Sequence, residues 1–552
     1  MPSFREELDS RQRSQSATRA RRWLFVPYDQ QSDEIGPLAS EPPEALGIIL
    51  VESPWKARRR PYHKRKLALI LSNLRHFALE QAERGVAVRH VVHDGPYREA
   101  LAPLAQELGP LRCMEPAERE LRIDIAALVE SGAIEIVPHE AWLTTREQFE
   151  ASGPAPWRMD RFYRRVRTDL RVLMDGQRPV GGKWSLDADN RQPWKGEPEA
   201  PAFPTFEVDA IKLEVAALIE ARFADHPGHV DLHSLPATKQ DARALWAWAK
   251  DGCLENFGRF EDAMTTRSTQ LFHTRISALL HLCRLLPRDC LRDVLDLDIS
   301  LNSKEGFVRQ LLGWREFMRW THVATDGFRE LPRGVGTRTE RVPVGDGGWS
   351  RWSGRAWERD HHGALLGGDD DSVRPTSLAS QQEALPLPAA FWSADSGLAC
   401  LDHVVRDVWE TGYGHHITRL MVLSNIATLV GVDARELCDW FWVAYEDAFD
   451  WVVEPNVLGM GSFALGELFT TKPYVSGAAY IHKMSDYCKT CRFDPKKDCP
   501  ITRFYWAFLA TNEESLRGNP RMAMPLRSLA KRDAAAKQED AAILRAWQER
   551  LA

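Results

Sequence analysis

The sequence lacks the features of exported and membrane-spanning proteins. No run of about 18 apolar residues occurs, so we expect no transmembrane helix. Residues 1–22 contain no apolar stretch, which argues against a secretory signal, and their Glu6, Glu7 and Asp9 argue against a transit peptide. Nine cysteines in 552 residues are too few for a disulfide scaffold. We therefore expect reduced thiols, no membrane association and a cytoplasmic location.

A net positive charge is also lacking. The 78 acidic residues outnumber the 72 Lys and Arg residues, and the formal net charge is −6. Because the whole chain repels polyanions, binding to nucleic acid would require a local basic surface. The composition, 44% hydrophobic and 27% charged, is that of a globular protein and excludes disorder along the whole chain. At about 150 residues per domain, the length predicts two to four domains.

The first part of the chain alternates between short apolar runs and segments of helical periodicity. The apolar runs are bounded by polar or Pro-containing stretches and are typical of buried strands. Alternation of this kind predicts a parallel sheet with helices on both faces, an α/β domain over residues 22–141. The predicted strands are residues 23–26, 48–51, 86–92, 111–114 and 134–137, and the clearest helices are residues 64–84 and 97–108.

The rest of the chain predicts an all-α domain reached through a long connector. Residues 1–21 are expected to be a solvated, flexible arm, and residues 142–237 an ordered connector between domains. The all-α domain covers residues 238–527 and is followed by a helical tail, residues 528–552. Residues 334–383 are rich in Gly, Arg, Asp and Ser and predict a surface insertion. The expected helices of this domain are residues 243–253, 271–286, 304–321, 401–429 and 434–448.

Three cysteines lie within twelve residues of one another. Cys488 and Cys491 have the C-x-x-C spacing, and Cys499 is followed directly by a proline, as is frequent at iron–sulfur sites. Three clustered thiols need a fourth ligand, for which Cys400 and Cys438 are the candidates. Four thiolates suit zinc and an iron–sulfur cluster equally well, so the spacing leaves the metal open.

Three further segments carry polar groups that could face a ligand. On a helix His416 and Arg419 share one face, and a His beside a fixed cation has a tuned proton affinity that suits acid chemistry. Gln310 and Arg315 interrupt an aromatic stripe that would otherwise indicate only core packing. Thr274 and Ser277 offer hydroxyls to a phosphate. A His pair or an aromatic stripe taken alone is more often structural.

Aromatic residues are concentrated in the last third of the chain. The chain has 20 tryptophans, and burial in the core is the default for each. Oxidisable rings close to one another could also pass an electron to a buried redox cofactor. The set comprises Trp392, Trp409, Trp440, Phe441, Trp442, Trp451, Tyr474 and Tyr480.

In combination, several motifs resemble those of one family. Gly313-Trp314-Arg315-Glu316-Phe317 is similar to the Trp-Arg-Glu-Phe/Tyr signature of the photolyase and cryptochrome superfamily. Five further segments narrow the resemblance to the iron–sulfur bacterial cryptochromes and photolyases, which include prokaryotic (6-4) photolyases. These segments are residues 178–184, 414–417, 419–421, 455–460 and 483–488, and the resemblance runs from about residue 23 to residue 525.

The resemblance implies three cofactors. A 4Fe-4S cluster is expected on Cys400, Cys488, Cys491 and Cys499. FAD is expected in the helical domain, its phosphates held by Thr274 and Ser277, and its surroundings formed by Gln310, Arg315, His416, Arg419 and Asn456. A 6,7-dimethyl-8-ribityllumazine antenna is expected beside Tyr28, Asp29, Gln30 and Glu52. Tyr28 stands where relatives carry Gly, which would narrow the antenna site.

The resemblance also implies a reaction. Photoexcited reduced FAD would donate an electron to a flipped-out lesion in UV-damaged DNA, and the expected lesion is a (6-4) photoproduct. His415 is expected to donate a proton to the lesion, with His416 as its partner nearer the flavin. Trp440, Trp392 and Tyr480 would relay electrons, because Phe441 occupies a place where relatives often have the more easily oxidised Tyr. The alternative is a blue-light photoreceptor with the same cofactors, and in either case a monomer is expected.

Overall fold

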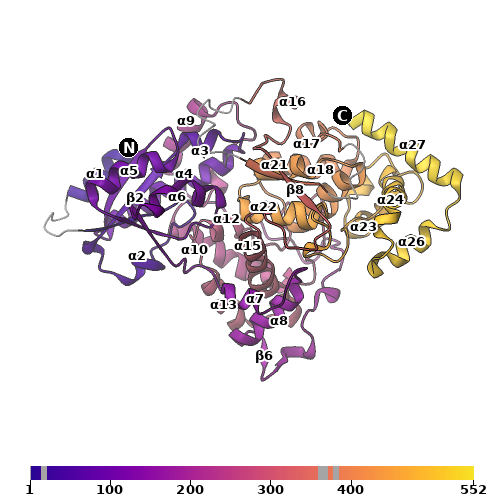
Figure 1. The fold of residues 1–552 in the computed structure, drawn as a ribbon, viewed down its shortest axis with the longest axis horizontal. Coiled ribbons are helices and arrows are strands. Elements are labelled where there is room, and N and C mark those ends of the chain that lie inside the picture. The colour runs from indigo at the N-terminus through magenta and orange to yellow at the C-terminus, as the bar shows by residue number, and fades with distance from the viewer. Residues whose placement is uncertain (1, 14–20, 358–370, 377–383, 552) are drawn as a thin grey trace.

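The N-terminal domain is built on a five-stranded parallel sheet. The computed structural model describes residues 2–13, 21–357, 371–376 and 384–551. The strand order is β3-β2-β1-β4-β5, and every residue of β2 is buried (Figure 1). The strands are β1 (Arg22–Phe25), β2 (Leu46–Glu52), β3 (Ala87–Val92), β4 (Leu111–Met114) and β5 (Ile134–Val137). The predicted α/β class is confirmed, and the chain reverses its strand order between β1 and β4, where such sheets bind ligands.

Helices connect these strands. The long helix α4 (Lys64–Glu83) follows β2, α5 (Tyr97–Leu108) follows β3 and α6 (Arg119–Glu130) follows β4; the short helices are α2 (Gly36–Ser40) and α3 (Pro54–Arg58).

The expected solvated arm over residues 1–21 is wrong for its first part. Phe4–Arg13 form helix α1, which packs on α4 and buries Phe4 and Leu8. These two apolar residues are spaced i, i+4, so one narrow face is enough to dock an otherwise polar helix.

The connector over residues 142–237 contains regular structure. Its helices are α7 (Arg146–Glu150), α8 (Met159–Leu170) and α9 (Ala210–Arg222), and a short hairpin pairs β6 (Met174–Asp175) with β7 (Arg178–Pro179). Helix α9 returns to pack on α4. In Figure 1, α7, α8 and β6 form the lower end of the molecule, below the junction of the two domains.

The C-terminal domain is helical, as predicted. Its helices before the insertion are α10 (Lys239–Trp248), α11 (Leu254–Phe257), α12 (Ser277–His281), α13 (Pro287–Asp296), α14 (Leu301–Val308) and α15 (Glu316–Ala324). Those after it are α17 (Ala390–Ser393), α18 (Ala399–Thr411), α19 (His416–Thr418), α20 (Asn425–Val430), α21 (Ala434–Ala444), α22 (Asp450–Glu454), α23 (Ala478–Met484), α24 (Pro500–Thr511), α25 (Glu513–Leu516) and α26 (Ala523–Leu529). The tail forms α27 (Ala534–Leu551), which packs on α24. Among the described residues, no helix is both long and apolar enough to cross a membrane.

Two of the expected helices are interrupted. Residues 271–286 were expected to be one helix, but Leu271 and Arg275 have positive φ angles of 47° and 52°, and only α12 forms. The expected helix over residues 401–429 ends at Gly412, whose φ is 62°. These conformations are unfavourable for a continuing helix, and they leave residues 271–276 and 412–415 as loops.

The predicted insertion, residues 334–383, is partly regular. β8 (Arg338–Pro343) pairs with β9 (Asp371–Thr376) in antiparallel fashion, and α16 (Trp349–Ser353) lies between them in sequence. β9 packs on α21 and buries Val373 completely. Residues 358–370 and 377–383 of the insertion lie outside the described residues. The described part is therefore docked on the helical domain.

Candidate active site and metal centre

The helical domain encloses a cavity of about 310 Å³. Its walls come from α12, from the segments around α14 and α15, and from the chain between α18 and α22. All seven residues that the resemblance assigns to the flavin line this one cavity: Thr274, Ser277, Gln310, Arg315, His416, Arg419 and Asn456. They are spread over more than 180 positions of sequence, and folding alone brings them together.

Three π-helical segments form much of this wall. They are Arg309–Arg315, Arg419–Ser424 and Pro455–Gly461. A π-helical turn holds one more residue than an α-helical turn, which shifts the phase of the following side chains, and such turns occur frequently at functional sites. Gln310, Arg315, Arg419 and Asn456 all belong to these segments. The local departures from α-helix therefore coincide with polar side chains that face the cavity.

Arg419 is held by a carboxylate that the sequence analysis did not select. Its two terminal nitrogens each lie 3.0 Å from the Asp447 carboxylate, and Ser277 Oγ donates a hydrogen bond of 2.6 Å to the same group. Burial alone would raise the pKa of Asp447, but the Arg419 charge and these hydrogen bonds outweigh it and lower the pKa. Asp447 is thus an anion that fixes two cavity-lining side chains.

A second carboxylate anchors the opposite wall. Gln310 Nε2 donates to Glu261 Oε1 at 2.5 Å, and Asn190 of the connector donates to Glu261 Oε2 at 3.0 Å. Burial raises the pKa of Glu261. The connector therefore takes part in shaping the cavity.

Several polar atoms in the cavity wall have no hydrogen-bond partner. Within the described part of the chain these buried atoms are His273 Nε2, Arg275 Nε, Arg315 Nε, His415 Nδ1 and Tyr445 Oη. Buried polar groups are almost always satisfied, so a concentration of unpartnered atoms around one cavity is the pattern expected of a site for a polar ligand.

The two neighbouring histidines differ in environment. The His415 ring is buried and stacks on the His273 ring, with the ring centres 4.3 Å apart, and burial lowers its pKa well below the ordinary value. His416 is exposed and lines the same cavity. Desolvation by the surrounding cavity wall, and then the Arg419 charge, lower the pKa of His416 to about 4. Both histidines line the cavity, and His416 is the more exposed of the two.

The four predicted cluster cysteines also converge. Cys400 lies in the first turn of α18, Cys488 and Cys491 lie in the loop after α23, and Cys499 directly precedes α24. All four line one small cavity of about 10 Å³. Burial, followed by the neighbouring thiols, raises the pKa of Cys400 well above its usual range. The rival candidate, Cys438, is buried elsewhere, near Arg435.

Although the four thiols lie close together, they do not have the geometry of a site for a single metal ion. Within the described ranges, no three His, Cys, Asp or Glu side chains are arranged to hold one metal ion. The remaining walls of the cysteine cavity are mainly apolar, with Leu398, Ile481, Phe493 and Ile501 among them. The four thiols therefore line a small and mainly apolar cavity.

The α/β domain has a smaller cavity, of about 120 Å³, at the carboxyl ends of its strands. Tyr28 and Glu52 line it. The Glu52 carboxylate is already engaged, because Arg75 binds it at 2.7 and 3.0 Å and His90 at 2.9 Å. Although burial raises the pKa of Glu52, these hydrogen bonds lower it to about 2.

The other two predicted antenna residues are buried beside this cavity but do not line it. Gln30 Nε2 donates to the carbonyl groups of Met114 and Glu115 at 3.1 and 3.2 Å. Burial raises the pKa of Asp29 to about 7. The Tyr28 ring lies between Tyr97 and Phe449, with centre distances of 6.2 and 6.4 Å, and fills space that Gly would leave open.

The predicted electron-relay residues do not all lie together. Trp440 is fully buried, and its ring centre lies 5.2 Å from that of Phe441, which lines the large cavity. Trp392 belongs to the same aromatic group through Trp409. Tyr480 lies elsewhere: its hydroxyl donates to Asp262 at 2.8 Å, and no ring contact among the described residues joins it to Trp440. Trp409 belongs to the aromatic set of the sequence analysis but not to the three relay residues chosen from it, because nothing in its spacing shows that it contacts both Trp392 and Trp440.

Comparisons with known proteins show what the chain is similar to. Residues 24–234 match the family described as deoxyribodipyrimidine photo-lyase-related protein. The chain is 33% identical over 530 residues to the (6-4) photolyase of Agrobacterium fabrum, covering 91% of this chain and 94% of that protein. A solved class III photolyase from Agrobacterium tumefaciens has a TM-score of 0.50 at 14% identity and covers 97% of this chain and 99% of its own. A Synechocystis cryptochrome has a TM-score of 0.51 at 12% identity and covers 96% and 100%.

Proposed function

Because the chain belongs to the iron–sulfur bacterial cryptochrome and photolyase family, we propose that it is a light-driven DNA photolyase that repairs (6-4) pyrimidine–pyrimidone photoproducts. The observation that carries the proposal is the large cavity of the helical domain. All seven predicted flavin residues line it, His416 among them, together with the other candidate proton-transfer histidine, His415.

The cavity has the size and the polar groups expected of a ligand site. Its volume of about 310 Å³ lies within the usual range for ligand sites, roughly 300–1,000 Å³. The Thr274 and Ser277 hydroxyls would hold the phosphates. The Arg419–Asp447 pair and the unpartnered atoms of Arg315 and Tyr445 would face the rest of the cofactor. When bound and reduced, FAD supplies the light-excited electron that splits the lesion.

We assign the proton donor to His416 and not to His415, which the sequence analysis favoured. A group that acts on a flipped-out base must be accessible from the cavity, and His416 is the exposed member of the pair. His415, stacked on His273, positions the loop. Anionic DNA raises the pKa of a nearby His because it stabilises the imidazolium form, so substrate binding prepares His416 to donate.

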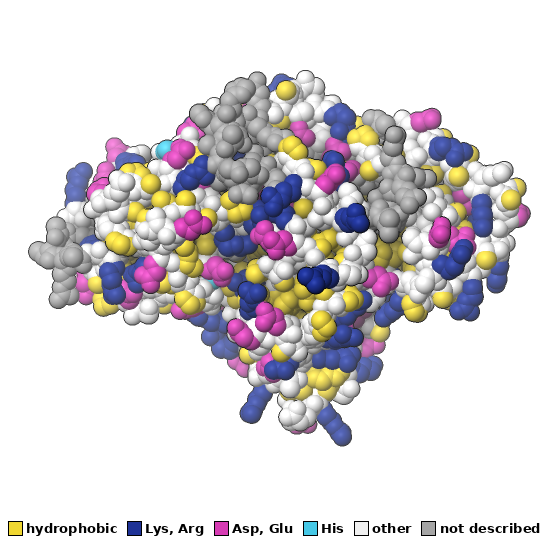
Figure 2. All heavy atoms as spheres, viewed as in Figure 1, with side chains coloured by type: hydrophobic (Ala, Val, Ile, Leu, Met, Phe, Trp, Pro, Cys, Tyr) yellow, Lys and Arg dark blue, Asp and Glu magenta, His cyan; other side chains and the backbone are white. Residues whose placement is uncertain are grey.

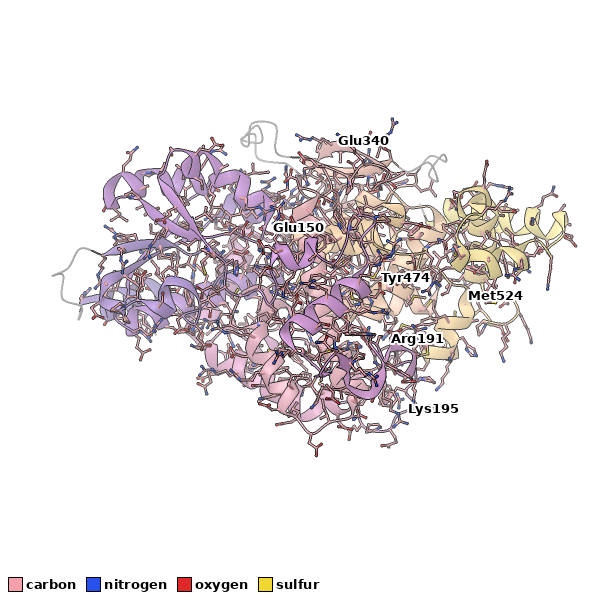
Figure 3. All side chains as sticks on the ribbon, turned by 60° about the horizontal axis from the view of Figure 1, so that its bottom comes forward. Glu150, Arg191, Lys195, Glu340, Tyr474 and Met524 are labelled. Atoms are coloured by element: carbon pink, nitrogen blue, oxygen red, sulfur yellow. The ribbon has the colours of Figure 1, made fainter. Side chains whose placement is uncertain are left out.

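A local basic surface near His416 would bind the DNA backbone. The Asp187 charge acts on His416, and Arg191 forms an ion pair with Asp187. Burial lowers the pKa of Lys472, and so do the nearby positive charges of Arg521 and Arg191. Phosphates bind where such charges cluster, even when the net charge of the protein is negative. In Figure 3 this face is turned toward the viewer, with Arg191 and Tyr474 labelled on it, and Figure 2 shows Lys and Arg side chains gathered at the lower end of the molecule.

The four cysteines would hold a 4Fe-4S cluster. The support is that all four predicted thiol ligands, from segments far apart in the sequence, line one cavity, and four thiolates are the usual ligands of such a cluster. Burial, followed by Cys491 and Asp494, raises the pKa of the Cys488 thiol to about 11. Cluster binding would therefore release protons and stabilise the loop between α23 and α24.

The lumazine antenna fits its expected site poorly. The cavity beside Tyr28, about 120 Å³, is below the usual size of a ligand site, roughly 300–1,000 Å³. Glu52 is already engaged with Arg75 and His90. We propose that this chain binds the antenna weakly and is excited mainly through the flavin itself.

The test is a light-dependent repair assay on (6-4) and cyclobutane substrates with the purified, chemically reduced protein. We expect repair of the (6-4) substrate in light and none in the dark. A protein that binds and photoreduces FAD but repairs neither lesion would instead be a blue-light photoreceptor.

A further inference from the structure

Two arginines from distant parts of the sequence meet at the surface beside the cysteine cavity. Arg492 directly follows Cys491, and Arg550 lies in the last turn of α27. A Cβ atom placed on Gly397 would lie 3.0 Å from Nη2 of Arg492 and 2.7 Å from Nη2 of Arg550. Because both nitrogens lie so near the same point, the two guanidinium groups are close neighbours.

Neither guanidinium group is neutralised by a carboxylate. Arg492 and Arg550 are both exposed, and among the described residues no ion pair or hydrogen bond joins either side chain to another group. The carboxylate on the adjoining turn, that of Asp402, is engaged within its own segment. It accepts hydrogen bonds from the Ser396 hydroxyl and from the backbone N–H groups of Ser396 and Gly397, at 2.5, 2.7 and 2.9 Å.

An aromatic ring holds each arginine in place. The guanidinium carbon of Arg492 lies 4.6 Å from the centre of the Phe493 ring, and that of Arg550 lies 4.7 Å from the centre of the Trp547 ring. The two rings contact each other, with their centres 5.8 Å apart. Because a guanidinium group is attracted to the face of an aromatic ring, these contacts keep two positive charges together despite their mutual repulsion.

The backbone at Gly397 permits this meeting. Its φ is 77°, a conformation that favours glycine, and any side chain there would collide with both guanidinium groups. Gly397 also lies just before the beginning of α18, and the N–H groups in the first turn of a helix carry partial positive charge. Positive charge from three separate segments therefore converges at this point.

The same three segments enclose the cysteine cavity. Helix α18 carries Cys400, Arg492 belongs to the loop that carries the other three cysteines, and Phe493 of this loop lines the cavity. Helix α27 covers the loop through Trp547 and packs on α24; in Figure 1 these two helices lie together at the right end of the molecule. A ligand that joined these segments would hold closed the part of the chain that carries the four cysteines.

A phosphate ion matches the arrangement of the two guanidinium groups. A guanidinium group is a planar donor that binds phosphate through two parallel hydrogen bonds. Two such groups side by side can bind different oxygen atoms of one phosphate, and their mutual repulsion is then replaced by attraction to a shared anion. A carboxylate can satisfy one guanidinium group in this way, whereas phosphate has enough oxygen atoms for both.

We propose that Arg492 and Arg550 form a binding site for inorganic phosphate, and that the bound ion ties α27 to the cysteine-bearing loop and slows the loss of iron. Binding itself does not depend on photolyase activity; only the effect on iron rests on the proposed cluster. Arginines that merely covered two aromatic rings would not need to meet over a glycine.

Equilibrium dialysis against radiolabelled inorganic phosphate tests the site, with flavin- and iron-loaded protein at constant ionic strength. We expect the wild type to bind phosphate at this site, and Arg492→Gln and Arg550→Gln to lose that binding. Both variants replace an exposed side chain by a polar one and should fold. Arg545→Gln is the matched control: it removes an exposed arginine of α27 that is not among the atoms nearest Gly397, and it should bind as the wild type does.

A second measurement follows the rate at which a chelator removes iron from the protein. Phosphate should slow this rate several-fold in the wild type and in Arg545→Gln, because the bound ion holds the loop closed. It should have no effect in Arg492→Gln or Arg550→Gln. Chloride at the same ionic strength should not protect the wild type, since a single-atom ion cannot form paired hydrogen bonds with two guanidinium groups.

Three results would overturn the proposal. A wild type that binds no phosphate, or equal binding in Arg492→Gln and Arg550→Gln, would exclude the site. Phosphate that binds as expected but leaves iron release unchanged would exclude the role in holding the loop. Displacement of the phosphate by undamaged duplex DNA would place the two arginines in a DNA-binding surface instead. A wild type without iron would contradict the proposed cluster, and phosphate binding could still be measured.

Discussion

The two cavities that the resemblance assigns to FAD and to the antenna differ in how well motif residues predict them. In the helical domain all seven predicted flavin residues line the cavity, whereas in the α/β domain Tyr28 and Glu52 line it and Asp29 and Gln30 do not. The first cavity has about 310 Å³ and several unpartnered polar atoms, and the second has about 120 Å³. A motif therefore identifies where a site lies, but one large side chain decides how much space the site offers.

Replacing the predicted cluster cysteines provides the sharpest test of the sites in the helical domain. Cys400→Ser should abolish iron binding, because a cluster with one ligand missing is lost as a unit, and the protein should become less soluble since cluster binding is coupled to folding. Iron and acid-labile sulfide analysis of the purified variant checks this. Cys438→Ser is the control: this thiol does not line the cysteine cavity and should retain full iron. Loss of iron in Cys438→Ser alone would reverse the assignment.

The histidine pair tests whether accessibility decides the catalytic role. His416→Ala should reduce (6-4) repair by about 10²–10⁴-fold, the usual contribution of a general acid, while the flavin remains bound. His415→Ala should have a smaller effect, exerted through the loop. Repair rates of the chemically reduced His416→Ala and His415→Ala variants under constant light distinguish these two effects. Equal losses would mean that exposure does not distinguish the roles.

The same pair predicts the pH dependence of repair. The pKa of His416 is lowered to about 4 in the free protein, so the protonated form that must donate becomes scarcer as the pH rises. Repair by the wild type should therefore fall with increasing pH, and the residual repair of His416→Ala should lose this dependence. A parallel pH profile in the two proteins would assign the titration to another group.

The Arg419–Asp447 pair tests how far the cavity wall supports the fold. Asp447→Ala leaves the Arg419 charge without its partner and should lower the free energy of unfolding by about 3–5 kcal/mol. Urea unfolding and the flavin content of the purified protein measure the two consequences. The exposed Arg165–Asp169 pair on α8 provides the control, since Asp169→Ala should cost at most about 1 kcal/mol. Similar losses in both variants would show that burial adds nothing to the inner pair.

Much of the fold follows from local pattern. The strands of the α/β domain are short apolar runs with polar boundaries, and the structure has them where the sequence predicts them. The helix breaks at Leu271, Arg275 and Gly412 were not predicted, because the first two are ordinary residues that only tertiary contacts hold at positive φ. The docking of α1 through Phe4 and Leu8 was missed for a related reason: two apolar residues are too few for a periodic signal.

The sequence predicts those residues of the candidate site that belong to recognisable motifs. Arg419 belongs to a motif, but its partner Asp447 does not, and only the structure joins them. Trp409 comes from a segment whose spacing contains no information about its contacts with Trp392 and Trp440. A side chain that acts through a neighbouring residue can therefore be identified only from the structure. Side chains expected to contact the same cofactor can be recognised from sequence motifs.

The smallest expected effect concerns the antenna cavity. Tyr28→Gly removes the ring that lies between Tyr97 and Phe449 and should let the cavity accept 6,7-dimethyl-8-ribityllumazine. We expect the variant to retain more of the added chromophore than the wild type, measured as bound lumazine fluorescence after gel filtration, and flavin binding in the distant helical cavity to stay the same. Tyr28→Phe keeps the ring and removes only the hydroxyl, so it should bind no more lumazine than the wild type. If Tyr28→Phe gained as much as Tyr28→Gly, the unpartnered Tyr28 hydroxyl, and not the volume of the ring, would be what limits the site.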